Sequence, residues 1–140
     1  ALAAGADMVF SAHDGDPIPA VRQACAGRGP DCVIEAVGRA ETWAQAVGMV
    51  RKGGRVCLFG GCAPGTEVPV DAHKIHYGQL SLLGVFHHTP RYFSAAVKLL
   101  KARKVKTDLL ISDEISLDDV PAFFEAMHHR SNANKVAVFP

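Results

Sequence analysis

The chain has 140 residues, of which 49% are hydrophobic and 21% charged, a balance typical of one folded globular domain and not of a disordered chain. Fifteen Lys and Arg against fourteen Asp and Glu give a net charge of +1 without a basic block, so the electrostatic pattern of a nucleic-acid-binding protein is missing. No apolar run approaches the roughly 20 residues that cross a bilayer, and the first residues lack a secretion signal. We therefore expect a cytoplasmic protein with neither nucleic-acid nor membrane partners.

Short apolar runs alternate with amphipathic stretches along the chain. The runs predict strands over residues 6–10, 31–37, 55–59, 80–86, 109–115 and 135–139. A helix follows the Asp16-Pro17 cap, and the next one carries Trp43, Ala46, Val47 and Val50 on one face. Strands that alternate with helices of this length indicate βαβ units, and we predict an α/β fold with a parallel sheet.

Two more helices are predicted near the end of the chain. The first is capped by Thr89-Pro90, and the second begins near residue 118. Ser116-x-x-Asp119 resembles a capping box, but a cap at Ser116 would place Pro121 beyond the first helical turn. We therefore expect Asp118 to cap this helix, which puts Pro121 inside the first turn.

The cysteines and histidines do not form a recognisable metal motif. The four cysteines lack the paired CxxC spacing of a zinc ribbon, so we expect reduced, mostly buried thiols. His73 and His76 lie three residues apart but lack the glutamate of a zinc-protease helix motif. The sequence therefore predicts no metal site within this chain.

Two predicted strands end in glycine, which makes that edge of the sheet a candidate ligand site. Gly38 follows the strand over residues 31–37, and Gly60 and Gly61 follow the strand over residues 55–59. Ligands of open parallel sheets bind beyond the carboxyl ends of strands, where glycine allows close approach to the backbone. The alternative is that these are simply turn glycines. The GxGxxG fingerprint and the Walker A loop are both absent.

Glu35 is a carboxylate within an otherwise apolar predicted strand. It could be a buried acid with a raised pKa, or it could lie at an exposed strand end or pair with a neighbour. Catalysis by Glu35 is the less favoured interpretation, and we assign no catalytic residue to the chain.

An ordered series of segments resembles the zinc-type medium-chain dehydrogenases/reductases. The segments are GAD-MVF, PDCVIEAVGRAET, VRKGGRVCLFGG, IHYGQLSLLGVFHHTPRYFSAAVKLL, SLDDVPAFFEAM and NKVAVFP. The similarity covers almost the whole chain and is strongest toward the alcohol, polyol and threonine dehydrogenases. It implies a partial Rossmann-like parallel sheet with flanking helices that lacks the first βαβ unit. Residues 1–107 would be the second part of a dinucleotide-binding domain, and residues 108–140 the helix and strand that return toward an absent catalytic domain.

The same resemblance implies contacts to NAD or NADP, some of them at the adenosine and pyrophosphate groups. Val37, Gly38 and Arg39 match the turn that lines the adenosine half of the cofactor. Lys135 matches a position where a basic residue reaches the pyrophosphate, and a lysine can serve there as a point charge.

The other implied contacts are at the nicotinamide end. Phe59, Gly60 and Gly61 match a strand end whose backbone meets the carboxamide, and Leu83 with Gly84 matches a second backbone contact. The glycine-rich fingerprint and the zinc ligands of the family would lie outside this chain, so zinc would belong to the intact parent protein.

The function implied is hydride transfer between nicotinamide and an alcohol or polyol, in a parent enzyme of which this chain alone would be inactive. A homodimer is expected through residues 80–86 and the preceding loop. If residues 6–10 and 31–37 are the third and fourth strands of a Rossmann sheet, they either pair directly or leave exposed edges. Two alternatives stay open: a non-catalytic nucleotide-binding or dimerisation module, and a fragment of a zinc-free quinone reductase, which the HHTPRYF segment disfavours.

Overall fold

The computed structural model describes residues 1–127 and 135–140, and the chain divides into two compact units. One unit comprises residues 10–87, and the other comprises residues 1–9 together with 88–140. Within the described part of the chain, every helix is too short or too polar to cross a bilayer.

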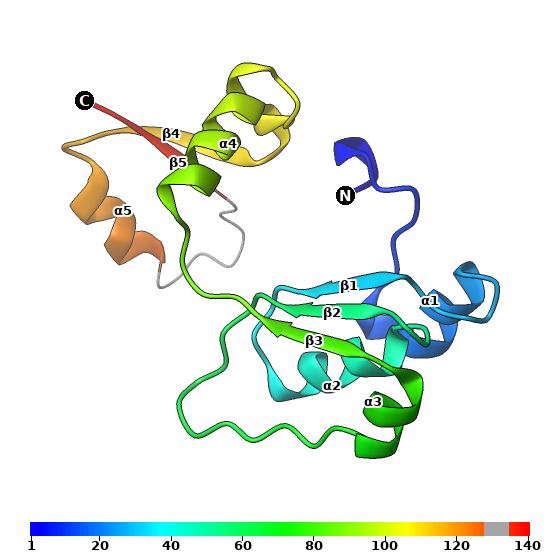
Figure 1. Cartoon of the computed structure of the whole chain (residues 1–140). Coiled ribbons are helices and arrows are strands. Elements are labelled where there is room, and N and C mark those ends of the chain that lie inside the picture. Colours follow the sequence, from blue (N-terminus) through cyan, green and yellow to red (C-terminus); the bar gives the residue numbers. More distant parts are fainter. Residues whose placement is uncertain (128–134) are drawn as a thin grey trace. The chain divides into compact units, whose positions relative to one another are not determined.

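The unit of residues 10–87 contains a three-stranded parallel sheet in the order β1-β2-β3 (Figure 1). The strands are β1 (Cys32–Glu35), β2 (Arg55–Leu58) and β3 (Ser81–Gly84). Pairing aligns Ile34 with Cys57 and Cys57 with Leu83, so these three side chains point to the same face of the sheet. The predicted α/β class and parallel pairing are confirmed.

A short 3-10 helix, η2 (Ala12–Asp14), and α1 (Pro17–Ala24) precede β1. The helix α2 (Ala40–Met49) connects β1 to β2, and α3 (Ala72–Gly78) connects β2 to β3. Asp16 caps α1 as predicted, because its Oδ1 accepts a 3.0 Å hydrogen bond from the Ile18 amide. The sequence did not predict α3, whose first turn is capped in the same way by Asp71 through the Lys74 amide at 3.0 Å.

The core of this unit lies between α2 and one face of the sheet. Ala46 of α2 and Val50, which directly follows the helix, are buried against Val56 of β2. Partly buried side chains pack around them: Val33, Leu58, Leu80 and Leu82. Figure 1 shows α2 lying against this face. Burial of this apolar surface holds the three strands in register, and this positions the turns that follow them next to one another.

The opposite face of the sheet is open. Ile34 is 68% exposed and Leu83 is 49% exposed, although both are apolar and lie in a central row of the sheet. In the described part of the chain β1 pairs only with β2, so one of its edges is free. The prediction of a strand over residues 6–10 is wrong: this segment is extended coil, and Met8 and Val9 are more than half exposed. A strand needs a hydrogen-bonded neighbour, and this segment has none to join.

The second unit is built around a two-stranded parallel sheet. Its elements are η1 (Leu2–Ala4), α4 (Pro90–Lys101), η3 (Thr107–Leu109), β4 (Ile111–Ser116), α5 (Val120–Met127) and β5 (Lys135–Phe139), and β4 pairs with β5. The predicted cap of α4 is present, since Thr89 Oγ1 accepts from the Tyr92 amide at 3.4 Å. The bounds of β5 agree with the predicted strand over residues 135–139.

The start of α5 differs from the prediction. The helix begins after Asp119 and not at Asp118, and its first bond runs from the Phe123 amide to the Asp119 carbonyl at 2.9 Å. Ser116 Oγ donates to Asp119 Oδ2 at 2.6 Å, so the Ser116–Asp119 pair that the sequence analysis set aside does form. It closes a turn that precedes the helix, and Pro121 still falls in the first helical turn, where its missing N–H costs little.

Candidate functional site

The turns that follow β1 and β2 lie in direct backbone contact. A Cβ added to Gly38, whose φ is +80°, would overlap the carbonyl oxygen of Gly61 and lie 3.0 Å from its carbon. A Cβ on Gly60 would overlap the Gly38 nitrogen and lie 2.8 Å from the Val37 nitrogen. Gly38 and Gly60 are therefore required by the packing of the two turns against each other, as the turn-glycine interpretation holds for these positions.

Glu35, the last residue of β1, ties the two turns together. Its Oε1 accepts hydrogen bonds from the amides of Val37 at 2.7 Å and Gly38 at 2.9 Å. Thr42 Oγ1 donates to the same oxygen at 2.8 Å. The Glu35 carbonyl also accepts from the amides of Phe59 and Gly60, both at 2.9 Å. One residue thus fixes the path of the chain after both strands.

The Glu35 carboxyl is only 5% exposed, yet it is held in its charged form. Burial alone would raise the pKa of Glu35, but hydrogen bonds from the Gly38 amide, Thr42, the Val37 amide and Trp43 outweigh burial and lower that pKa below its ordinary value. The alternative of a buried acid with a raised pKa is therefore wrong. Glu35 acts as a charged anchor for the turn, as expected of a carboxylate that pairs with its neighbours.

The side chain of Trp43 supports the second turn from α2. Its indole Nε1 donates a 3.0 Å hydrogen bond to the Gly60 carbonyl oxygen. The sequence predicts Trp43 on the apolar face of its helix, but neither this polar contact nor the hydrogen bond of Thr42 was predicted. The contact of Trp43 could have been inferred from its chemistry, because a partly buried tryptophan needs a hydrogen-bond acceptor for its N–H and turn carbonyls are nearby acceptors.

Exposed apolar side chains and open backbone lie side by side at this edge. Val37 is 66% exposed, Phe59 is 65% exposed, and a Cβ added to Gly61 or Gly84 would meet nothing within 4 Å. A ligand can therefore reach the backbone at Gly61 and Gly84 while it covers the Val37 and Phe59 side chains. Glycine permits this close approach at positions that the fold itself leaves free.

The structure brings eight of the nine predicted site residues to this edge of one sheet. They are Val37, Gly38, Arg39, Phe59, Gly60, Gly61, Leu83 and Gly84. Arg39 is exposed and begins the turn into α2, where its amide donates to Thr42 Oγ1 at 3.3 Å. Lys135 begins β5 in the other compact unit, and its part in a site stays a prediction.

Metal-ligating side chains do not cluster in the part of the chain that the structure describes. Across residues 1–127 and 135–140, no group of three or more His, Cys, Asp or Glu side chains could hold a metal ion. All four cysteines are free thiols, but the expectation that they are mostly buried is wrong, because Cys32 is exposed and the other three are half-buried. Cys32 and Cys57 lie on the open face of the sheet, which leaves their side chains accessible.

Comparison with known proteins confirms the resemblance seen in the sequence. A family model described as zinc-binding dehydrogenase matches residues 1–102. Sorbitol dehydrogenase of Bacillus subtilis is 24% identical over 137 residues, and an alcohol dehydrogenase of Cupriavidus necator is 23% identical over 138 residues. Each alignment covers 97% of this chain but 38% of the relative, so the chain spans well under half the length of these proteins.

Solved structures share the fold over the same extent. Alcohol dehydrogenase TADH from Thermus sp. ATN1 is similar with a TM-score of 0.82 and 30% identity, covering 97% of this chain and 39% of that protein. A protein assigned as a zinc-binding dehydrogenase from Sinorhizobium meliloti 1021, solved bound to NADP, is similar with a TM-score of 0.85 and 29% identity, covering 97% and 40%. Because the family model matches most of this chain and solved zinc-binding and alcohol dehydrogenases share its fold, the chain belongs to the zinc-binding dehydrogenase family.

Proposed function

We propose that this chain forms part of the NAD(P) site of a zinc-dependent alcohol or polyol dehydrogenase. The observation that carries the proposal is the open backbone of Gly61 and Gly84 beside the exposed side chains of Val37 and Phe59. The names of the relatives, sorbitol and alcohol dehydrogenases, support alcohols or polyols as the substrate class of the whole protein. Bound NAD(P) would supply the hydride acceptor or donor for that reaction.

Each part of the edge has a proposed role in holding the cofactor. The Val37–Gly38–Arg39 turn lines the adenosine half, where the exposed Arg39 side chain can flank the adenine ring. The backbone after Phe59 and the backbone at Gly84 present peptide groups to the carboxamide of the nicotinamide. Because Glu35 fixes the first turn and Trp43 the second, this backbone is held rigidly before a ligand arrives.

Lys135 and the domain arrangement complete this proposal. Lys135 supplies a positive charge to the pyrophosphate. Residues 1–107 form the second part of a dinucleotide-binding domain, and residues 108–140 return toward a catalytic domain. The described residues offer no zinc-ligand set, so the catalytic metal would be held by other parts of the whole protein and this chain alone would turn over no alcohol.

Association and location follow from the surface and the thiols. The exposed apolar side chains of residues 80–86, among them Leu83 and Phe86, support a homodimer formed through this strand region. The four free cysteines support a reducing, cytoplasmic compartment.

The proposal is tested by titrating the isotopically labelled chain with NAD⁺ or NADP⁺ and following amide shifts. Binding in the millimolar range should move the amide signals of Gly38, Gly61 and Gly84. The affinity should be weak because only part of the site is present. A Gly61→Val substitution should abolish these shifts by filling the open space, whereas Ser81→Val at the opposite end of β3 should leave them intact.

Two outcomes would contradict this function. Shifts that appear elsewhere, or that survive in the Gly61→Val variant, would remove the cofactor from this edge. Absence of binding combined with concentration-dependent self-association would favour the alternative of a non-catalytic dimerisation module. Sub-millimolar binding of NAD⁺ would show that the site is complete within this chain.

A further inference from the structure

A cavity of about 660 Å³ opens at the amino ends of the three strands β1, β2 and β3. It is lined by segments that precede β2 and β3, by the end of α1 and the residues after it, and by α3. Gly61 follows β2 and Gly84 is the last residue of β3, so the candidate cofactor site lies at the carboxyl ends of these parallel strands and this cavity at the other edge of the sheet. The proposed function makes no use of it.

Positive charge is concentrated in this cavity. Residues 10–87 contain seven Lys and Arg and seven Asp and Glu, so the unit carries no net charge. Five of the seven cations line the cavity: Arg22, Arg28, Arg51, Lys52 and Lys74. Asp71 is the only acidic residue in the lining, and its carboxylate already accepts from the Lys74 amide as the cap of α3. These cations are scattered along the sequence, so only the fold brings them together.

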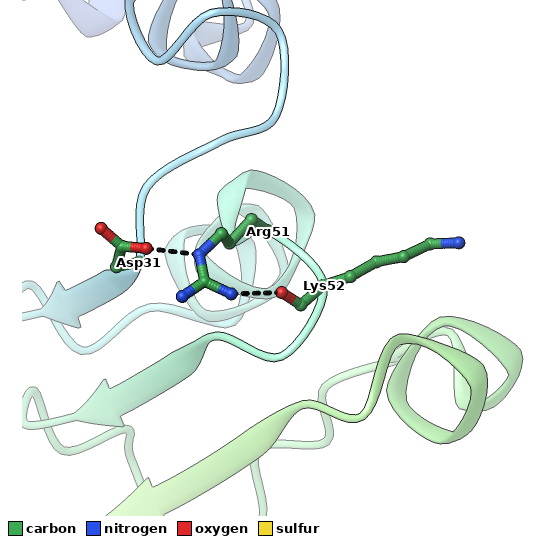
Figure 2. A network of polar contacts seen from close by, with 3 residues as sticks. All are labelled: Asp31, Arg51 and Lys52. Atoms are coloured by element: carbon green, nitrogen blue, oxygen red, sulfur yellow. Dashed lines mark hydrogen bonds and ion pairs between the residues drawn. The ribbon is translucent and has the colours of Figure 1, made fainter.

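Arg51 is occupied, but it helps to position Lys52. Its Nε pairs with Asp31, and its Nη1 donates to the Lys52 carbonyl oxygen at 2.6 Å (Figure 2). This network fixes the loop between α2 and β2. The Lys52 side chain extends away from the Asp31–Arg51 pair (Figure 2). Lys52 is exposed, so its ammonium group can meet a ligand.

Arg22 and Lys74 are two cations held close to each other in the cavity. Lys74 Nζ donates to the Gly48 carbonyl at 2.6 Å, and Arg22 Nη2 donates to the Gly27 carbonyl at 3.3 Å. Burial, followed by the positive charge of Arg22, lowers the pKa of Lys74, while Asp71 opposes this. Each cation keeps further N–H donors, because an ammonium has three and a guanidinium five. An anion between them would replace their repulsion by attraction.

We propose that this cavity binds a polyphosphate anion, either free or as the di- or triphosphate group of a nucleotide, through Arg22, Arg28, Lys52 and Lys74. Several cations around one cavity match a ligand that carries several negative charges on separate phosphate groups. The volume exceeds what a single phosphate would fill. Tyr77, which lines the same cavity and is 67% exposed, offers a ring on which a nucleotide base can stack.

Calorimetry on the intact chain with inorganic tripolyphosphate, and separately with ATP, tests the proposal. Both should bind at one shared site, and added salt should weaken them because surface charges are screened. Arg22→Gln and Lys74→Met should each weaken tripolyphosphate binding by about tenfold, the loss expected for one charge-assisted hydrogen bond. Arg55→Gln and Lys98→Met, which alter exposed cations outside the cavity, should leave the affinity unchanged.

Three further measurements distinguish the possible outcomes. Lys52→Met changes an exposed side chain and serves as a third variant should Lys74→Met fail to fold. ATP that binds more tightly than tripolyphosphate identifies a nucleotide as the source, and equal affinities identify the phosphate chain alone. Gly61→Val should leave tripolyphosphate binding intact, which separates this site from the proposed cofactor edge. Lack of binding at millimolar concentrations, or equal weakening by the cavity and control variants, would overturn the proposal.

Discussion

The Oε1 atom of Glu35 accepts a 2.9 Å hydrogen bond from the amide of Gly38 across the turn that ends β1. The same oxygen also accepts hydrogen bonds from the Val37 amide and the Thr42 hydroxyl. The Glu35 backbone carbonyl accepts from the amides of Phe59 and Gly60 in the turn after β2. One strand-terminal residue therefore holds both turns at the candidate site, the first through its carboxylate and the second through its backbone carbonyl. Four predictions concern this carboxylate, the two turns and the open face of the sheet.

Glu35→Ala should destabilise the unit of residues 10–87 by about 3 kcal/mol, because it leaves the partly buried Val37 and Gly38 amides without their charged acceptor. Glu35→Gln keeps one acceptor oxygen and should cost about 1 kcal/mol. Trp43 is the only tryptophan and lies at the affected turn, so urea unfolding followed by its fluorescence measures this unit directly. Glu67→Gln, in an exposed loop, is the control and should change stability little. Equal stability of all three variants would contradict the anchoring role.

The stability of this unit should fall at acid pH. The folded-state pKa of Glu35 lies below its ordinary value, so its contribution is fully present above the unfolded pKa of about 4.3 and is lost as pH falls through the folded value. Asp31, whose pKa the hydrogen bond and charge of Arg51 lower, adds in the same direction. Unfolding free energies measured from pH 7 downward should therefore decline less steeply in Glu35→Gln than in the unaltered chain. Parallel curves would rule out Glu35 as a contributor.

Gly38→Ala and Gly61→Ala should differ sharply although both glycines lie in the paired turns. The first introduces a Cβ at a φ of +80° and against the Gly61 carbonyl, and should cost about 2 kcal/mol or more. The second adds a methyl group to open space at an ordinary φ, and should change stability by less than about 0.5 kcal/mol. Thermal unfolding of both variants checks this contrast. Similar losses would mean that the turns do not pack as described.

Ile34→Lys should shift the chain toward the monomer. The exposed row of Ile34, Cys57 and Leu83 and the free edge of β1 are the surfaces that favour association with another chain. Sedimentation velocity should show concentration-dependent association of the unaltered chain and a reduced tendency in Ile34→Lys. Val70→Lys, at an exposed apolar position in the loop before α3, is the matched control. A monomeric mass at every concentration would contradict the expected association.

Local chemistry made much of the fold predictable from sequence. The Asp16-Pro17 and Thr89-Pro90 caps, and the apolar strands bounded by glycine, depend on neighbours within a few residues. The helix α3 was not predicted because its seven residues are mostly polar or histidine and show no apolar periodicity. The segment of residues 6–10 was misassigned for the opposite reason, since its composition suits a strand but strand formation depends on a partner elsewhere.

The candidate site was predictable in outline and not in mechanism. Glycine after two adjacent strands pointed to one edge of the sheet, and the structure gathers eight of the nine predicted residues there. That Gly38 and Gly60 serve turn packing, whereas Gly61 and Gly84 leave space, depends on distances between segments far apart in the chain. The group of cations around Lys74 could not be predicted from the sequence either, because it also depends on contacts between distant segments.

Within residues 1–127 and 135–140 the two parallel sheets share no strand: β1, β2 and β3 form one sheet, and β4 pairs with β5 in the other. Each unit therefore has its own set of slow-exchanging, hydrogen-bonded amides. Unfolding of one sheet does not remove the hydrogen-bond partners of the other. Native-state hydrogen exchange should accordingly resolve two cooperative groups with separate opening energies, and a single melting temperature would describe neither of them.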